Sequence, residues 1–437
     1  MATGAVSTIG LSSADRLPGA MRILLIHRYF WPDSPPYASM LRVIARHLAE
    51  QGHDVTVLTT QPSYTRETSQ WKRPRVEEMD GFRVVRKWMF PESKSNWLAR
   101  IANVGVFLFH ILAHILLRRR RYELVTASTM PPVVVGAAAC GATRLRRGRF
   151  LYHCMDLYPE VAELAGSRWL GRGPLRGLLG WLDRRTCRKA WRVLVLSQDM
   201  QAALAARGLE TTNIRILNNF ALEAEEAPSQ GVLGPDQGRF RVLFAGNLGR
   251  FQGLETVLEA AQKLPAEAGI EFHFLGDGAA KQSLEQQAGE LLGERVHFHG
   301  FRPLADALGA MREADLGIVS LQPGIVSVAY PSKTMTYLAA GLPILAMVER
   351  QSELAEMVAR EEVGFTVEYG DADGMAQGLR AIAADRARHT QWRRQAERLA
   401  EREFSAQAAL RRWDQLLAED EVPGATMVPS RDADRLA

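Results

Sequence analysis

The residues with the clearest chemistry in this chain lie in a polar loop that leads into a short helical segment. Ser332 and Lys333 open a helical pattern that stops at Gly341, and Pro343 then starts an apolar run. The first turn of a helix has unpaired backbone N–H groups and the positive end of the helix dipole, which favour an anion. Lys333 adds a full positive charge at the same place. This arrangement predicts a binding site for a phosphate or diphosphate group.

Two glycine-rich turns upstream are expected to meet this loop. One follows the apolar run 241–245 and the other follows 271–275. Ligands of open parallel sheets bind outside the carboxyl ends of the strands, where glycine lets the backbone come close to phosphate or ribose. The C-terminal half is therefore predicted to bind a nucleotide. The candidate residues of the two turns are Gly246, Asn247, Gly249, Arg250, Gln252, Gly276, Asp277 and Gly278.

A carboxylate in the N-terminal half is the first candidate for catalysis. Asp156 follows the apolar run 150–153, so its side chain is expected at a strand end over the cleft. A carboxylate there can orient a reacting hydroxyl group. Aspartate is also a preferred helix cap, and a capping role for Asp156 is an equal alternative. His153, on the same strand, is the second candidate, although a strand histidine is more often buried.

The order of these motifs resembles a known enzyme family. The C-terminal half closely resembles the donor domain of the retaining GT-B glycosyltransferases of the GT4 family, within the colanic-acid, exopolysaccharide and O-antigen subgroup. The motifs that carry the resemblance are GNLGRFQGLETVLEA at 246–260, FLGDG at 274–278, RVHFHGF at 295–301 and PSKTMTYLAAGLPILA at 331–346. The segments 21–32, 48–59 and 156–159 resemble the acceptor domain of the same family, so the match covers residues 21 to 415.

The resemblance implies a fold and an activity. The fold is α/β of the GT-B type, with two Rossmann-like domains facing across a cleft. The activity is transfer of a sugar, with retention, from a nucleotide-sugar to a lipid-linked acceptor, expected to be polyprenyl-diphosphate-linked, in exopolysaccharide or O-antigen synthesis. Ser332, Lys333, Thr336 and the two glycine turns would bind the donor, with Asp156 and His153 as catalytic residues. No cofactor and no metal are expected.

Four positions depart from the family pattern. Asn247 and Gln252 stand where a basic pair is usual, and Val328 and Thr336 stand where paired glutamates are usual. Lys333 and the nearby Arg250 are the candidates to replace the missing charges. Thr336 offers the ribose a weaker hydroxyl contact. Val328 indicates an unusual sugar, a shifted register or reduced activity.

The DxD-like run at 371–373 is expected to be structural. It follows an apolar run and precedes a helical pattern. Aspartate at such a position is an ordinary helix cap. We therefore expect the charge of the leaving diphosphate to be stabilised by basic groups rather than by a metal.

An aromatic loop at 29–37 is the candidate contact for the acceptor. Tyr29, Trp31 and Tyr37 lie in it, and Pro35 and Pro36 stiffen it. Aromatic rings at a cleft can stack on a sugar or contact lipid. Packing beneath the loop is the alternative, and it is favoured for Tyr29.

The elements that must position these residues form two βαβ series. The first has apolar runs at 22–27, 54–59, 83–86, 123–127 and 150–153, and the second has them at 241–245, 271–275, 296–299, 315–320, 343–347 and 364–367. A length of 437 residues with 47% hydrophobic residues suits two cores. The predicted divisions are a disordered leader at 1–20, an acceptor domain at 21–220, a linker at 221–237, a donor domain at 238–395, a helix at 396–420 that returns to the first domain, and a disordered tail at 421–437.

Cysteine usage favours a reducing compartment. The three cysteines are Cys140, Cys154 and Cys187, without zinc-type spacing. Residues 1–20 lack the charged start and apolar run of a signal peptide. These features predict a cytoplasmic protein with reduced thiols.

The basic residues are concentrated in one part of the chain, which predicts an anionic partner. Residues 83–192 contain 21 Lys and Arg against six Asp and Glu, whereas the whole chain carries only +5. Within this part, the apolar segment 97–117 runs into four arginines. We interpret it first as a helix in the membrane interface, then as a buried helix, and least as a membrane span. The candidate membrane residues are Trp97, Phe107, Phe109, Arg118, Arg119, Arg120 and Arg121, at the inner face of the cell membrane.

Two other functions stay open at the level of sequence. A nucleotide-sugar 2-epimerase uses the same architecture but needs no membrane acceptor. A degenerate protein that binds a nucleotide-sugar without transfer would explain Val328 and Thr336. Nucleic-acid binding is not expected, because the basic segment lacks the motifs of such proteins.

Overall fold

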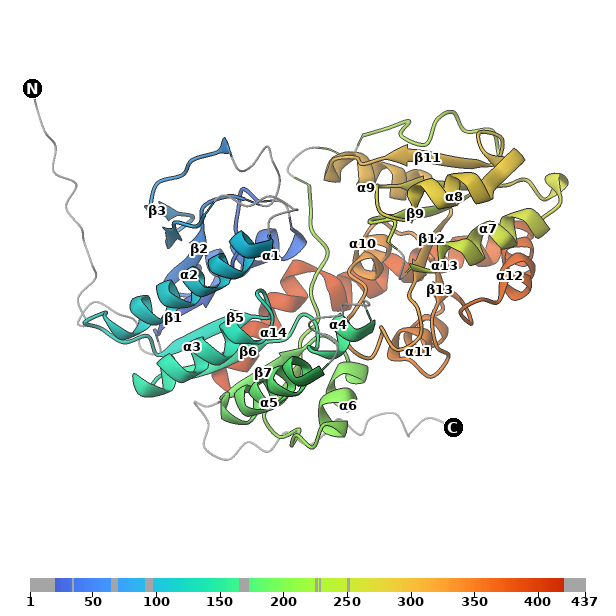
Figure 1. The fold of residues 1–437 in the computed structure, drawn as a ribbon. Helices are drawn as coiled ribbons and strands as arrows, with labels where there is room; N and C mark the ends of the chain where they lie inside the picture. The colour runs from blue at the N-terminus through green and yellow to red at the C-terminus, as the bar shows by residue number, and fades with distance from the viewer. Residues whose placement is uncertain are drawn as a thin grey trace, which may run out of the picture.

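The computed structural model of the protein describes residues 20–33, 35–63, 70–90, 97–164, 173–224, 227, 229–249 and 252–419. The expected tail, the expected leader up to residue 19, and Arg250 lie outside these residues. Two sheets, each covered by helices, lie side by side (Figure 1).

The first sheet has eight strands in the order β3-β4-β2-β1-β5-β6-β7-β8. β3 is antiparallel to β4, and the other pairs are parallel. The strands are β1 (Arg22–Ile26), β2 (Asp54–Thr60), β3 (Val76–Met79), β4 (Phe82–Lys87), β5 (Leu124–Ser128), β6 (Arg149–His153), β7 (Arg192–Val195) and β8 (Ile214–Ile216). The five predicted strands are present, and the sequence analysis missed β3, β7 and β8.

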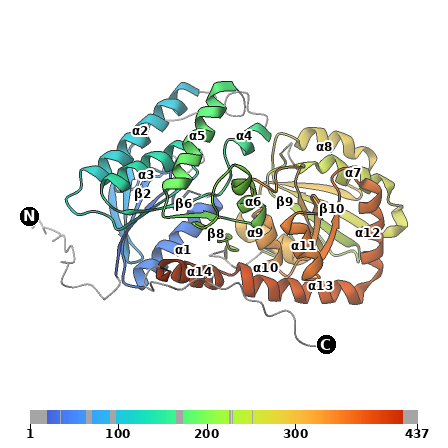
Figure 2. The same ribbon diagram turned by 90° about the horizontal axis from the view of Figure 1, so that it is seen from below.

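Two helical layers cover this sheet. The helices are α1 (Pro36–Glu50), α2 (Trp97–Leu116), α3 (Val134–Leu145), α4 (Glu160–Leu164), α5 (Gly173–Lys189) and α6 (Gln198–Ala206). On one face, α3 lies between α2 and α5, while α1 lies on the other face (Figure 2). The layer of α2, α3 and α5 is therefore an outer surface of the first domain.

The second sheet has six parallel strands in the order β11-β10-β9-β12-β13-β14. The strands are β9 (Phe240–Ala245), β10 (Ile270–Leu275), β11 (Val296–Gly300), β12 (Leu316–Ser320), β13 (Ile344–Met347) and β14 (Gly364–Val367). Every residue of β9 and β10 is buried, as expected of parallel strands covered on both faces. All six predicted strands are present. The strand order reverses between β9 and β12, so their carboxyl ends form the switch point where ligands bind in such sheets.

The second domain ends in helices that return to the first. Its helices are α7 (Leu254–Lys263), α8 (Lys281–Ala288), α9 (Leu304–Glu313), α10 (Lys333–Ala339), α11 (Glu353–Arg360), α12 (Ala372–Ala384) and α13 (Arg386–Leu399). A π-helical turn, Ala400–Phe404, leads into α14 (Ala406–Ala418). Trp413 of α14 is 1% exposed and packs in the same core cluster as Ile23 of β1. Asp414 also lies 2.7 Å from Nε2 of His47 on α1.

The segment between the domains packs on the second one. In its described part, residues 221–237 contain no helix or strand. The backbone N–H groups of Val232 and Leu233 donate to the Glu313 carboxylate at 3.1 and 2.9 Å. Another core cluster contains residues of both domains, including Tyr152 and Val328. The two domains therefore share buried apolar contacts.

Candidate functional site

The two glycine turns of the second domain pack backbone against backbone. A Cβ on Gly276 would lie 1.9 Å from the carbonyl oxygen of Gly246, and one on Gly278 would lie 2.2 Å from that of Leu248. Gly246 and Gly276 have φ values of +143° and +140°, which side chains of L-residues rarely allow. Only glycine fits at these positions. The carboxyl ends of β9 and β10 therefore present bare backbone at the switch point.

Lys333 lies beside this bare backbone. Its Nζ is 3.5 Å from a Cβ built on Gly246 and 3.7 Å from the centroid of the Phe244 ring. Nζ donates to the side-chain oxygen of Gln252 at 3.5 Å. Desolvation by the surrounding protein lowers the pKa of the ammonium group to about 7. A cation held in this way, with no carboxylate among its contacts in the described residues, is well suited to bind a phosphate.

The other predicted donor residues have different surroundings. Gln252 contacts Lys333, so this departure from the family pattern orients the cation. Asn247 is exposed beside Gly249, with its side-chain nitrogen 2.8 Å from a Cβ built there. Asp277 pairs with Lys281 at 3.0 Å, and this hydrogen bond lowers its pKa.

The helix after this loop is shorter than the sequence predicted, and its first turn makes fewer side-chain contacts. α10 has seven residues, and the hydroxyl of Ser332 makes no capping bond. The hydroxyl of Thr336 donates to the Ser332 carbonyl at 3.5 Å. The hydroxyl of Tyr337, which the sequence analysis did not consider, accepts from the Ala245 N–H at 2.7 Å and fixes the end of β9. Lys333 therefore supplies the charge at this site.

Asp156 contacts the second domain through its backbone. It forms an antiparallel bridge with Ala329, and the N–H of Leu157 donates to the Val328 carbonyl at 2.7 Å. Burial raises the pKa of the Asp156 carboxyl to about 6. The following helix, α4, begins at Glu160, so Asp156 is not at its N-cap and the capping interpretation is wrong. Ala329 and Lys333 are four positions apart in the chain, a span of at most about 14 Å. Asp156 and Lys333 therefore lie at neighbouring positions along the contact between the two domains.

His153 is a buried neighbour of this site. It is 1% exposed, and burial lowers its pKa to about 3, so its ring is neutral. Its Nδ1 lies 2.9 Å from the hydroxyl of Tyr37, and its ring packs edge-on against Trp413 at 5.9 Å. His153 and Tyr37 therefore support the end of β6. They form a link between the aromatic loop and the strand that leads to Asp156.

The other two aromatic residues of the loop pack within the first domain. The guanidinium groups of Arg42 and Arg73 lie 4.8 and 4.9 Å from the centroid of the Trp31 ring. Tyr29 packs on His27 at 6.5 Å and beneath Arg28 at 5.2 Å. Packing was expected for Tyr29, and it also holds for Trp31. The expectation that Trp31 stacks on a sugar is corrected, because arginine side chains cover its ring.

The predicted membrane helix, α2, has two apolar faces. Phe107 is fully buried against the sheet, so its assignment to the membrane is wrong. Phe109 and Ile101 are 67% and 62% exposed and point to the opposite side. The side chain of Trp97 lies outside the described part. By length and composition, α2 is the one helix of the described chain that could cross a membrane, but its Phe107 face belongs to the core of the domain.

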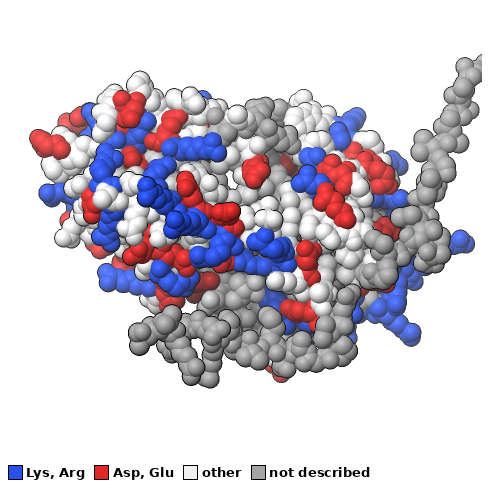
Figure 3. Space-filling view, turned by 180° about the vertical axis from the view of Figure 1, so that it is seen from behind, with Lys and Arg blue, Asp and Glu red and all other residues white. Residues whose placement is uncertain are grey.

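A second helix of the same layer also exposes apolar side chains. Leu175, Leu178 and Trp181 of α5 are 39%, 56% and 51% exposed. Their spacing of three residues places them along one side of the helix, whereas Gly180, Asp183 and Cys187 on the other side are buried. The sequence analysis considered only the arginines of this segment, although the spacing was visible. On the opposite side of the molecule, by contrast, basic and acidic side chains are mixed (Figure 3).

The DxD-like run is engaged in structural contacts. The side chain of Asp371 accepts from the Gly374 N–H at 2.8 Å and caps α12. Asp373 pairs with Lys263 at 2.6 Å. The predicted capping role is confirmed for Asp371.

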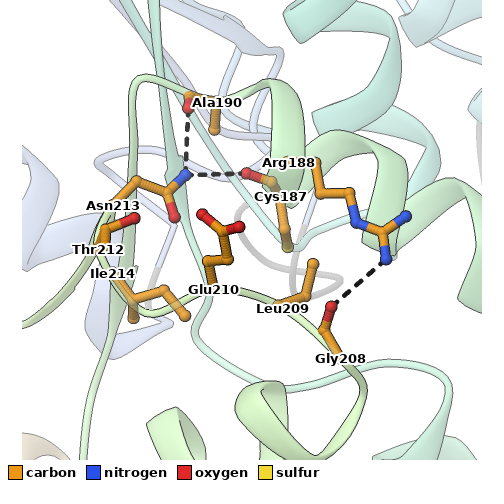
Figure 4. Close-up of a pocket in the computed structure, with 9 residues that line it drawn as sticks. All are labelled: Cys187, Arg188, Ala190, Gly208, Leu209, Glu210, Thr212, Asn213 and Ile214. Carbon is orange, nitrogen blue, oxygen red and sulfur yellow. Dashed lines mark hydrogen bonds between the residues drawn. The ribbon is translucent and has the colours of Figure 1, made fainter.

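A hollow of about 530 Å³ lies elsewhere in the first domain, between the end of α5 and the start of β8 (Figure 4). Asn213 donates to the Cys187 and Ala190 carbonyls at 3.0 and 3.2 Å, and Arg188 donates to the Gly208 carbonyl at 3.4 Å. This hollow is at the amino end of the sheet and contains none of the predicted site residues. The carboxyl ends of the strands, where the predicted site residues lie, are therefore the candidate active site.

Two protein families match this chain. The family described as "Glycosyl transferase 4-like domain" matches residues 37–219, and the family described as "Glycosyl transferases group 1" matches residues 239–385. The first match contains every strand of the first sheet except β1, and the second match contains the whole second sheet. Together they cover most of the chain.

Individual relatives and solved structures agree with the family matches. The probable glycosyltransferase WbjE of Pseudomonas aeruginosa is 27% identical over 66% of this chain and 73% of its own. The putative colanic acid biosynthesis glycosyl transferase WcaI of Escherichia coli K12 is 24% identical over 88% of this chain and 97% of its own. Sucrose-phosphate synthase from Thermosynechococcus elongatus superposes with a TM-score of 0.70 at 18% identity, covering 91% of this chain and 98% of its own. HepE from Anabaena, solved with UDP, superposes with a TM-score of 0.65 at 16% identity. The match covers 91% of this chain and 100% of HepE.

Proposed function

We propose that this chain, which belongs to the GT4 glycosyltransferases and has the GT-B fold, transfers a sugar with retention from a nucleotide diphosphate donor to a lipid-linked acceptor. One observation carries the proposal: the loop that pairs with Asp156 at Ala329 continues to Lys333, which lies beside the bare backbone of Gly246. This observation supports the proposal because it brings a carboxylate of the first domain and a cation of the second domain to the same part of the contact between the domains.

The proposed reaction uses these two groups. The acceptor hydroxyl oxygen bonds to the anomeric carbon as the bond from that carbon to the diphosphate oxygen breaks. The proton of the hydroxyl passes to the departing diphosphate. The Asp156 carboxylate stabilises the positive charge that develops on the sugar, and the Lys333 ammonium stabilises the negative charge on the diphosphate.

Uridine nucleotides are the first donors to test, because HepE, which shares the fold, was solved with UDP and with UDP-glucose. We expect UDP or its sugar conjugates to raise the unfolding temperature of the protein, since a ligand that binds the folded state stabilises it. The shift should be the same in Mg²⁺ and in EDTA, because Lys333 supplies the charge. A shift that appears only with Mg²⁺ would reject metal-independent donor binding, and a larger shift with GDP would reassign the donor.

The acceptor is proposed to be a polyprenyl diphosphate-linked sugar at the inner face of the cell membrane. The similarity to WcaI, a putative colanic acid biosynthesis glycosyl transferase, supports a role in exopolysaccharide synthesis. The outward apolar faces of α2 and α5 support contact with a bilayer, because large exposed apolar surfaces mark interaction sites. Arg119, Arg120 and Arg121 are exposed at the end of α2, where anionic headgroups would neutralise them.

Replacing Arg118, Arg119, Arg120 and Arg121 with glutamine should release the protein from anionic vesicles. Each basic residue near such a surface contributes about 1 kcal/mol, so about 4 kcal/mol of binding is removed. Flotation with vesicles that contain phosphatidylglycerol measures the loss. The control replaces four exposed arginines elsewhere with glutamine: Arg380, Arg394, Arg398 and Arg411. Equal flotation of the two variants would show that the α2 surface does not bind the membrane.

A further inference from the structure

The first turns of two helices face each other across the interface between the domains. α6 of the first domain begins at Gln198, and α11 of the second begins at Glu353. The N–H of Gln198 donates to the Glu353 carboxylate at 2.5 Å, and the N–H of Glu353 donates to the Asp199 carboxylate at 3.0 Å. Each helix thus receives a carboxylate from the other domain.

These bonds are additional to the ordinary caps of both helices. Ser197 caps α6 by accepting from the Met200 N–H at 3.1 Å, and Ser352 caps α11 by accepting from the Ala355 N–H at 3.3 Å. The carboxylates bond the first N–H groups, which the serines leave unpaired, at the positive ends of the helix dipoles. The exchange of carboxylates therefore depends on the positions of the two domains and not on the folding of either helix.

The same interface holds the loop that reaches the candidate active site. The Gly324 N–H donates to Glu349 at 2.6 Å, three residues before the cap of α11. Gly324 also meets Leu164 of α4, at 3.5 Å from a Cβ built on the glycine. The loop then passes Ala329, beside Asp156, and ends at Lys333. Movement of α11 away from α6 would therefore withdraw this loop from Asp156.

The contact is balanced between attraction and repulsion. Burial, as the largest cause, raises the pKa values of both Asp199 and Glu353. The neighbouring Glu356 adds charge repulsion to both. The helix dipoles and the two backbone N–H groups oppose this cost. Such a contact is suited to an interface that opens for substrates and closes for reaction.

We propose that Asp199 and Glu353 form a latch that closes the two domains and positions Asp156 against the loop 324–333. Neither carboxylate is placed at the reacting atoms, so both are positioning residues. The consequence for catalysis rests on the proposed function, whereas the closure does not depend on it.

The distance between the domains tests the latch without any substrate. Spin labels on the full chain at Ala206→Cys and Ala359→Cys report it, because both sites are exposed and the three native cysteines are buried. Asp199→Ala and Glu353→Ala should lengthen or broaden the measured distance. Asp199→Asn and Glu353→Gln should keep it, because an amide oxygen also accepts a hydrogen bond. The matched control is Glu356→Ala on the same helix, which removes a carboxylate that repels both latch residues and should therefore not lengthen the distance.

Kinetics separate positioning from a merely structural role. Each alanine variant should lower kcat about tenfold, as expected for the loss of a hydrogen bond to a charged group, with UDP affinity unchanged. The double alanine variant should lose no more than either single one, because both residues form one contact. An unchanged distance in both alanine variants would overturn the latch. A longer distance together with absent transfer in the wild-type protein would support the latch and reject the proposed activity.

Discussion

The Asp156→Ala variant is expected to bind the donor nucleotide normally and to transfer sugar about a hundredfold more slowly or worse, in line with the loss of a preorganised electrostatic group. The physical reason is its position. The backbone of Asp156 pairs with Ala329 of the second domain, and burial raises the pKa of its carboxyl to about 6. A steady-state assay that separates kcat from KM measures the effect.

Three controls sharpen this prediction. Asp156→Asn keeps the shape but not the charge, so it should also be slow if charge stabilisation is the role. Glu163→Gln, at an exposed acid on the nearby helix α4, should transfer at the wild-type rate. In the wild-type protein, kcat/KM should fall as the pH drops through about 6, because the carboxyl becomes protonated. Full activity of Asp156→Ala would remove Asp156 from the reaction.

The Lys333→Ala variant is expected to bind UDP about a hundredfold more weakly, a loss of about 2.7 kcal/mol. Its ammonium is the charge beside the bare backbone of Gly246, where a buried charged hydrogen bond to phosphate would be lost. Lys333→Met should lose as much affinity while keeping the packing on Phe244. Titration calorimetry measures these affinities.

The ionisation of Lys333 gives a second test of the same assignment. Because desolvation lowers its pKa to about 7, the free protein loses the charge as the pH rises through 7, and UDP affinity should fall there. Binding of the diphosphate favours the charged form and takes up a proton in this range. Lys263→Ala, which removes an exposed lysine paired with Asp373, is the control and should bind UDP normally. Equal affinity of the Lys333 and Lys263 variants would contradict the site.

Length and burial determined which strands could be predicted from the sequence. The six strands of the second sheet have four to six residues that are mainly apolar, and all were predicted. The three missed strands are short and carry charges. β8 has three residues with Arg215 in the middle, β7 follows the basic end of α5, and β3 contains Glu77 and Glu78 at the sheet edge. Tertiary pairing, rather than local pattern, makes these segments strands.

The candidate site was predictable only where it follows from local pattern. Lys333 and the glycine turns lie at strand-to-loop exits, which periodicity and glycine reveal. The pairing of Asp156 with Ala329 joins segments far apart in the chain, and no local signal marks it. Phe107 was assigned to the membrane because α2 is apolar on both faces, so the sequence did not distinguish the core face from the outer one.

Sugar transfer in EDTA tests the central claim most directly. Labelled sugar from a panel of UDP and GDP donors is offered to the full-length protein with a polyprenyl diphosphate-linked acceptor, and the label in the lipid extract is counted. The account predicts incorporation from one donor without added metal, and loss of it in both Asp156→Ala and Lys333→Ala. Incorporation that requires Mg²⁺ and survives in both variants would contradict it.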